Sequence, residues 1–247
     1  MNPHPTSLST RFFIRAYNLG RRNYREVLSI QRNLLESKKN GYLKDDILIL
    51  VEHNPVITIG KSGDRNDVLV TDDFLKKNCI DILEVERGGK VTYHGPGQLI
   101  VYPIFDLNRF GKDIHKIIRQ YEETIIYFLK SYDIKGERIK NFTGVWVNAK
   151  KIASIGITIR SWITFHGISI NIYAESIRNF SLINPCGLSS ENMTSISNIL
   201  NIPDKQIDLN DACIRLINSF EKVFDSDIIY ETDEISKLVK EKSPCIK

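Results

Sequence analysis

The stretch from Arg87 to Tyr102, RGGKVTYHGPGQLIVY, combines a glycine-rich turn with side chains that could bind a ligand. Glycine has no side chain, so it lets the backbone approach a ligand closely. The apolar residues that follow, Gln98 to Phe105, predict a strand that anchors the turn to a sheet. A surface hairpin that uses Gly and Pro only for its turn is the alternative interpretation.

Cys186 lies between Pro185 and Gly187 in the segment INPCG. Proline stiffens the backbone there, and glycine permits torsions that other residues rarely adopt. Such a loop can hold an exposed sulfur in a fixed place, as a nucleophilic thiol requires. A lone cysteine is also often an inert buried residue. Cys213 falls on the apolar side of a predicted helix, as a core residue would.

Lys151 follows another lysine at a predicted turn after the strand Val145–Asn148. In the next strand, Lys151–Arg160, every second residue from Ala153 onward is apolar until the strand ends. This alternation places Lys151 on the apolar side of the strand, unless a bulge intervenes. A desolvated lysine loses its proton more easily, by up to ~3–5 pKa units at full burial. Lys151 could then exchange a proton with a thiol.

Three histidines and an arginine are further candidates. His94 can bind a ligand, cap its turn or act as a base for Cys186. His166 fits a pocket wall or a structural position, whereas His53 is interpreted as a loop residue. Arg87 fits a contact to the loop, to a substrate group or to a structural carboxylate.

The composition bounds the class of protein. The chain has 247 residues, 42% hydrophobic and 26% charged, as in an ordinary soluble globular protein. The net charge of +4 favours a moderately acidic protein partner. The chain has no dense Lys/Arg cluster with interleaved aromatic residues, so we expect no nucleic-acid binding. Its apolar runs are shorter than a membrane span, so we expect no membrane insertion.

The cysteine pattern and the N-terminal residues indicate the cellular compartment in which the protein acts. None of the four cysteines forms a CxxC pair, so no zinc or other metal site is expected. Residues 1–25 carry five arginines and no acid, which weakly resembles a transit peptide. A predicted strand and helix use most of these residues, however. We therefore expect a reducing cytoplasm.

Hydrophobic periodicity predicts the secondary structure. The predicted strands are 9–17, 46–52, 56–60, 98–105, 145–148, 151–160 and 162–172, and the predicted helices are 23–37, 72–77, 113–132, 175–182, 209–224 and 234–241. Helices do not strictly alternate with strands, so the prediction is an α+β fold with a mixed sheet and flanking helices. We expect one catalytic domain over 1–247, with a larger sheet part (about 1–185) and a smaller helical C-terminal part (about 186–247).

Three motifs in order resemble those of the lipoyl(octanoyl) transferases. They are RGGKVTYHGPGQ (87–98), KIASIG (151–156) with TFHG (164–167), and INPCG (183–187). The resemblance covers roughly residues 20–200. It implies a fold similar to the catalytic domain of the biotin and lipoate protein ligases.

The resemblance also implies an activity. This is transfer of an octanoyl group from octanoyl-acyl carrier protein to a lysine of lipoyl domains, in 2-oxoacid dehydrogenase complexes and the glycine cleavage H protein. It is the first step of endogenous protein lipoylation. A Cys/Lys dyad, Cys186 and Lys151, would carry the acyl group as a thioester, with no cofactor or metal, in a monomeric enzyme. The substrate-binding residues implied are Arg87, Gly88, Gly89, Lys90, Val91, Thr92, Tyr93, His94, Ser154, Ile155, Gly156, Gly167, Ile168 and Ser169.

Two other functions remain open from the sequence. One is an ATP-dependent lipoate or biotin protein ligase on the same fold, and the other is a non-catalytic protein that binds acyl groups or their carrier. A phosphate-binding loop at Gly60-Lys61-Ser62 is excluded, because Pro55 stands where the first glycine of that motif is required.

Overall fold

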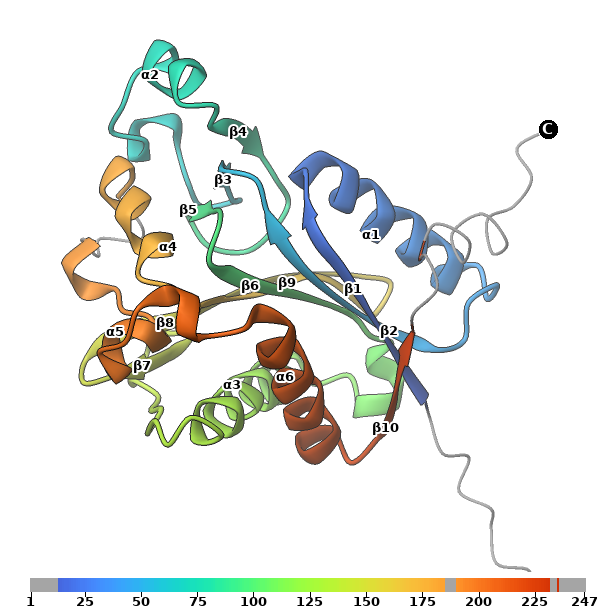
Figure 1. Ribbon diagram of the computed structural model, residues 1–247. Helices are drawn as coiled ribbons and strands as arrows, with labels where there is room; N and C mark the ends of the chain where they lie inside the picture. The colour runs from blue at the N-terminus through green and yellow to red at the C-terminus, as the bar shows by residue number, and fades with distance from the viewer. Residues whose placement is uncertain (1–12, 185–189, 232–234, 236–247) are drawn as a thin grey trace, which may run out of the picture.

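A seven-stranded mixed sheet forms the centre of the molecule, and helices cover both of its faces (Figure 1). The computed structural model describes residues 13–184, 190–231 and 235. The strand order is β10-β1-β2-β6-β9-β8-β7, in which β1 runs parallel to β10 and β2 while the other pairs are antiparallel. The strands are β1 (Phe13–Arg22), β2 (Asp46–His53), β6 (Gln98–Ile104), β7 (Val145–Val147), β8 (Lys150–Arg160), β9 (Ile163–Asn171) and β10 (Asp227–Glu231). The predicted α+β class with a mixed sheet is confirmed.

Strand β2 shows how the sheet is buried on both faces. Leu48 and Leu50 face one core with α3 (Ile114–Lys130) and α6 (Leu209–Phe224), whereas Ile47 and Ile49 face the other core with α1 (Tyr24–Lys39). Successive strand residues point to opposite faces, so a strand that is apolar throughout must lie centrally. The segment after residue 189 also contributes to this sheet, because β10 pairs with β1.

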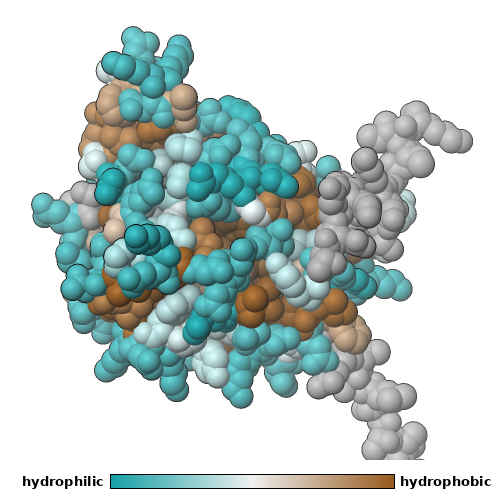
Figure 2. Space-filling model, viewed as in Figure 1, coloured by the Kyte–Doolittle hydropathy of each residue, from teal (hydrophilic) through white to brown (hydrophobic). Residues whose placement is uncertain are grey.

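A second, smaller sheet lies beside the first. It has three strands, in the order β4-β3-β5: β3 (Val56–Ile59), β4 (Asp81–Glu84) and β5 (Val91–His94). The helices near it are α2 (Asp72–Lys77) and α4 (Glu175–Arg178). Helix α5 (Ile196–Leu200) comes after α4 along the chain. Short 3₁₀ helices span Arg65–Asp67, Leu107–Phe110, Asn179–Leu182, Ser190–Asn192 and Asp204–Gln206. On the largely hydrophilic face in Figure 2, apolar surface gathers near α2, where Leu69 and Phe74 are exposed.

The predicted elements differ from the structure in a few places. Helices α2 and α6 have the predicted bounds, but the predicted helix 175–182 divides into α4 and a 3₁₀ turn. The first strand runs on to Arg22, and its predicted residues 9–12 lie outside the described part of the chain. The predicted helix 234–241 also lies outside it, except for Ile235. The sequence prediction missed the strands β4, β5 and β10 and the helix α5.

Two kinds of feature are absent from the described residues. No helix there is long and apolar enough to span a bilayer. No group of three or more His, Cys, Asp or Glu side chains in the same part of the chain is placed to bind a metal ion.

Candidate active site

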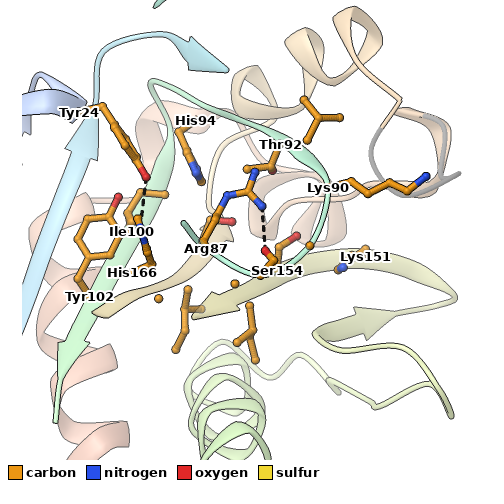
Figure 3. A pocket seen from close by; sticks show the side chains of 18 of the residues that line it. Tyr24, Arg87, Lys90, Thr92, His94, Ile100, Tyr102, Lys151, Ser154 and His166 are labelled. Carbon is orange, nitrogen blue, oxygen red and sulfur yellow. Dashed lines mark hydrogen bonds between the residues drawn. The ribbon is translucent and has the colours of Figure 1, made fainter. Parts of the chain in front are cut away.

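A cavity lies where the two sheets meet, between the glycine-rich loop and strands β6, β8 and β9 (Figure 3). Its empty volume, including the part open to solvent, is about 710 Å³. The residues that line it are Tyr24, Arg87, Gly88, Gly89, Lys90, Val91, Thr92, His94, Ile100, Tyr102, Lys151, Ser154, Ile155, Gly156, His166, Gly167, Ile168, Ser169, Phe180 and Met193. They come from segments far apart in sequence, so only the fold assembles the site.

Arg87 fixes the start of the glycine-rich loop. Its Nε and Nη2 donate to Thr58 Oγ1 (3.1 and 2.9 Å), and Nη2 also donates to the Thr58 carbonyl (2.6 Å). Nη1 donates to the Gly88 carbonyl at 3.0 Å. The guanidinium presents donors in a rigid fork, so one side chain can hold two backbone segments. Arg87 therefore both lines the cavity and holds its own loop in place.

A second loop, Gly60–Gly63, is hydrogen-bonded to the glycine-rich loop and holds it in place. Three backbone hydrogen bonds join them: Gly60 N to Lys90 O (2.8 Å), Lys61 N to Arg87 O (3.0 Å) and Ser62 N to Gly89 O (3.2 Å). A Cβ atom on Gly60 would lie 2.4 Å from the Gly89 carbonyl oxygen, closer than real Cβ contacts allow. Glycine at position 60 is therefore what lets the two loops meet.

Replacing Gly60 with alanine is expected to separate these loops. The added methyl group cannot move away from a backbone oxygen, so we expect a loss of about 1–3 kcal/mol in the free energy of unfolding. Thermal and urea unfolding measure it. Gly88→Ala is the matched control, because its Cβ would meet only the Ile157 carbonyl at 3.4 Å, an ordinary contact. Equal stability of the two variants would contradict the prediction.

Lys151 lies on the cavity side of β8, which corrects the predicted parity. Trp146 pairs with Lys151 and Val145 with Ala153, so Ile152 is an extra residue and the register shifts. This bulge turns Lys151 to the face opposite Ala153. Its Nζ lies 5.2 Å from the centre of the Trp146 ring. The periodic pattern could not reveal the bulge, because a bulge is defined only against the partner strand.

A chain of hydrogen bonds connects the glycine-rich turn to Lys151. His94 Nδ1 lies 3.1 Å from Gln98 Oε1, and Gln98 Nε2 donates to Asn171 Oδ1 at 3.0 Å. Asn171 Nδ2 donates to the Thr194 carbonyl (3.0 Å), and Thr194 N donates to the Lys151 carbonyl (2.9 Å). An amide oxygen accepts only, so His94 carries its proton on Nδ1. The chain fixes the backbone from which the Lys151 side chain extends.

Buried aromatic and histidine side chains close the other end of the cavity (Figure 3). The Tyr24 ring stacks on His94, with centroids 6.0 Å apart, and its hydroxyl lies 3.4 Å from His166 Nδ1. Burial lowers the pKa of His94 to about 3, and repulsion from a protonated His53 and from Arg87 adds to the shift. Burial also lowers the pKa of His166 to about 4, although Glu86, 3.6 Å from its Nε2, opposes the shift. Both imidazoles are therefore neutral at pH 7.

His53 is not the loop residue that the sequence predicts. It is fully buried at the end of β2, where Nδ1 donates to the Arg22 carbonyl (3.1 Å) and Nε2 accepts from Tyr102 Oη (2.8 Å). The tautomer follows from the carbonyl, which can only accept. Burial lowers the pKa of His53 to about 4. The prediction was wrong because Tyr102, far away in sequence, supplies the partner that permits burial.

The depressed pKa of His53 predicts a loss of stability in acid. In the unfolded chain a histidine titrates near 6.5, so between about pH 6.5 and 4 the unfolded state binds the proton first and the native state loses stability. His53→Gln should remove about 2 kcal/mol of the stability difference between pH 7 and pH 5, measured by urea unfolding. The exposed His115 gives the control, and His115→Gln should keep the wild-type pH dependence. An unchanged pH dependence in His53→Gln would refute this assignment.

The structure brings together most of the predicted site residues. Lys151 and all fourteen predicted substrate-binding residues except Tyr93 line the cavity. Tyr93 points away, and its hydroxyl accepts from Asn179 Nδ2 at 2.7 Å. Cys186 lies outside the described residues. The described residues on either side of that gap reach the site, since Phe180 and Met193 line the cavity and Met193 forms a β-bridge with Lys151.

Five lining residues were not predicted: Tyr24, Ile100, Tyr102, Phe180 and Met193. Ile100 and Tyr102 had a usable signal, because they alternate on the strand that leaves the glycine-rich turn and must share a face. Tyr24 had none, because the position of α1 over the cavity depends on tertiary packing.

Comparisons with known proteins agree with this geometry. Residues 23–221 match the family model described as the lipoyl protein ligase A/B catalytic domain. The chain is 43% identical over 209 residues to an octanoyltransferase of Clostridium kluyveri, covering 85% of this chain and 87% of that protein. Its fold is similar to lipoate-protein ligase A bound with ATP (TM-score 0.73, 18% identity, 92% of each chain). It is also similar to a bi-partite lipoate protein ligase, described with its E2 lipoyl domain, from Thermoplasma acidophilum (TM-score 0.71, 16% identity, 93% of this chain and 91% of that one).

These matches bear on the fold and on the class of protein. The two solved structures confirm the predicted likeness to the lipoate protein ligase fold. The family model covers most of the chain, and the octanoyltransferase match also spans most of both proteins. The chain therefore belongs to the lipoyl protein ligase A/B catalytic domain family, and it is an acyltransferase.

Proposed function

We propose that this enzyme transfers an octanoyl group from octanoyl-acyl carrier protein to a lysine of a lipoyl domain, through a thioester on Cys186. The observation that carries the proposal is the cavity that joins Lys151 to apolar lining residues and to the Arg87–Lys90 loop. The octanoyltransferase relative supports the acyl group, and the ligase described with its E2 lipoyl domain supports the class of acceptor.

In the first step the Lys151 amine takes the proton of the Cys186 thiol. The thiolate attacks the carbonyl carbon of the donor thioester, and a tetrahedral intermediate forms. The bond to the carrier sulfur then breaks, and that sulfur leaves with the proton held by Lys151. One thioester is exchanged for another, so the step is near balance in free energy.

In the second step the amine of the target lysine attacks the acyl-enzyme. Lys151 accepts the proton that the new amide nitrogen must lose, and the Cys186 sulfur leaves and recovers that proton from Lys151. Amide formation from a thioester is downhill, so the reaction requires no nucleotide or other cofactor. The thiol must stay reduced between turnovers, and a reducing cytoplasm favours that state.

The apolar lining gives the acyl chain its binding energy. Ile100, Ile155, Ile168, Phe180 and Met193 supply aliphatic and aromatic surface to the cavity. Each buried methylene contributes about 0.8 kcal/mol, so the ~7 alkyl carbons of an octanoyl chain together contribute several kcal/mol. We expect the enzyme to act as a monomer.

The test mixes the protein with octanoyl-acyl carrier protein in the absence of ATP. Intact-mass measurement should show one octanoyl adduct, and peptide mapping should locate it on Cys186. Adding a lipoyl domain should move the adduct to the domain's lysine. An absolute requirement for ATP would favour a ligase instead. Octanoyl binding without any adduct would favour a non-catalytic binding protein.

A further inference from the structure

Two exposed lysines stand on the paired loops at the rim of the cavity. Lys90 belongs to the glycine-rich loop, and Lys61 belongs to the supporting loop Gly60–Gly63. Both backbones are fixed, because Gly60 N and Lys61 N donate to Lys90 O (2.8 Å) and Arg87 O (3.0 Å). The rim therefore presents two ammonium groups from positions that do not depend on a flexible loop.

The rim and the cavity have a one-sided charge. The charged side chains that line the cavity are Arg87, Lys90 and Lys151, and no Asp or Glu lies among the described lining residues. Lys61 and Lys90 form no ion pair with any side chain in residues 13–184 or 190–231. The acids nearest to them along the chain already have partners. The Asp64 carboxylate accepts from Asn66 N, and Glu86 forms ion pairs with Arg32 and Arg160.

The lengths of the two substrate arms decide which substrate meets these lysines. A lysine side chain spans about 6 Å from Cα to Nζ, so the acceptor backbone must come close to the reacting carbon. A pantetheine arm spans about 16 Å from thiol to phosphate, so the donor's phosphate stays much farther away. Lys90 and Lys151 lie at the same end of the cavity (Figure 3). Lys90 therefore faces the residues next to the target lysine, and Lys61 stands on the loop that is hydrogen-bonded to the Lys90 loop.

We propose that Lys61 and Lys90 form a rim subsite that binds acidic side chains flanking the target lysine of the acceptor. The subsite selects lysines in acidic surroundings from the many exposed lysines of other proteins. The inference rests on the proposed function, because it needs an acyl-enzyme that a lysine attacks. Ion pairs at a solvent-exposed rim contribute little binding free energy, but they strongly affect the rate of association.

The experiment separates the two half-reactions. Octanoyl-enzyme is formed first from octanoyl-acyl carrier protein, and its transfer to a lipoyl domain is then timed. Lys61→Gln/Lys90→Gln should lower kcat/KM of the acceptor step about 3- to 10-fold at low salt, and clearly more than the acylation step. The difference should shrink as salt rises to ~0.5 M. Lys130→Gln, an exposed lysine at the end of α3, is the matched control and should behave as wild type.

A second experiment exchanges the charges of the acceptor's flanking residues and of Lys90. An acceptor whose flanking acids are changed to lysines should react slowly with the wild type and recover part of its rate with Lys90→Glu. Binding of the unmodified acceptor to Cys186→Ala, measured by titration, should show the same salt-dependent loss on removal of the rim lysines. It reports the subsite even if no acyl-enzyme forms, so failure of the proposed function is a separate result.

Three outcomes would overturn the subsite. One is an acceptor step and an acceptor affinity that are both unchanged in the double variant. Another is no recovery on charge exchange. The third is a slowed acylation step with the carrier donor but not with octanoyl-pantetheine, which lacks the phosphate, since that would assign the lysines to the donor.

Discussion

Cys186→Ala is expected to abolish octanoyl transfer and to leave no octanoyl adduct on the protein. The alanine side chain has no group that can form the thioester, and covalent catalysis divides one difficult step into two easier ones. We expect the transfer rate to fall by about 10³-fold or more. Intact-mass measurement after incubation with octanoyl-acyl carrier protein detects the adduct, and transfer to a lipoyl domain gives the rate.

The other cysteines provide the controls for this prediction. Cys79 is an exposed free thiol, so Cys79→Ala tests whether adventitious acylation contributes to the adduct. Cys213 is buried, and burial raises the pKa of its thiol to about 12, which leaves it unreactive at pH 7. Both Cys79→Ala and Cys213→Ala should keep the adduct. Full transfer activity in Cys186→Ala would end the proposed mechanism.

Lys151→Ala is expected to slow both half-reactions while the protein stays folded. Lys151 is the proposed proton carrier in acylation and in transfer, and a positioned acid–base group contributes about 10²–10⁴-fold in rate. Its side chain is partly exposed, and the backbone hydrogen bond from Thr194 N to its carbonyl remains in the variant. Single-turnover kinetics of each half-reaction measure the loss, and thermal unfolding verifies the fold.

Lys150 is the matched control, because it is adjacent, exposed and absent from the cavity lining. Lys150→Ala should react at the wild-type rate. If Lys151→Ala also did so, another base would be required, and His94 would be the next candidate. His94 is less suited, because its depressed pKa of about 3 makes its imidazolium a poor store for a proton at pH 7.

The sequence predicted the long elements well, because their periodicity is local. The apolar stripe of α6 predicts a helix that buries one face against the sheet, and the unbroken apolar run of β2 predicts a strand in the middle of the sheet. Strand β5 was missed because its four residues, Val91–His94, lie inside a stretch whose glycines suggest a turn. Strand β10 was missed because five residues at a sheet edge carry little pattern.

The site was predicted from motifs, whereas its detailed geometry depends on contacts between distant segments. The glycine-rich motif located the cavity wall, but the orientation of Lys151 depends on a bulge against β7. His53 needs Tyr102, and Arg87 needs Thr58, to be buried with their polar atoms paired. None of these partners follows from propensity or spacing.

The pairing of β10 with β1 has a consequence for synthesis of the protein. Residues 227–231 are made more than two hundred positions after the strand they join. While translation continues, the outer edge of β1 has unsatisfied N–H and C=O groups, and such an edge is prone to pair with other chains. Helix α6 leads directly into β10, so its docking on the sheet places the missing strand. Closure of that edge therefore waits until residues 227–231 have been made, and until then the nascent chain benefits from chaperones that cover the edge.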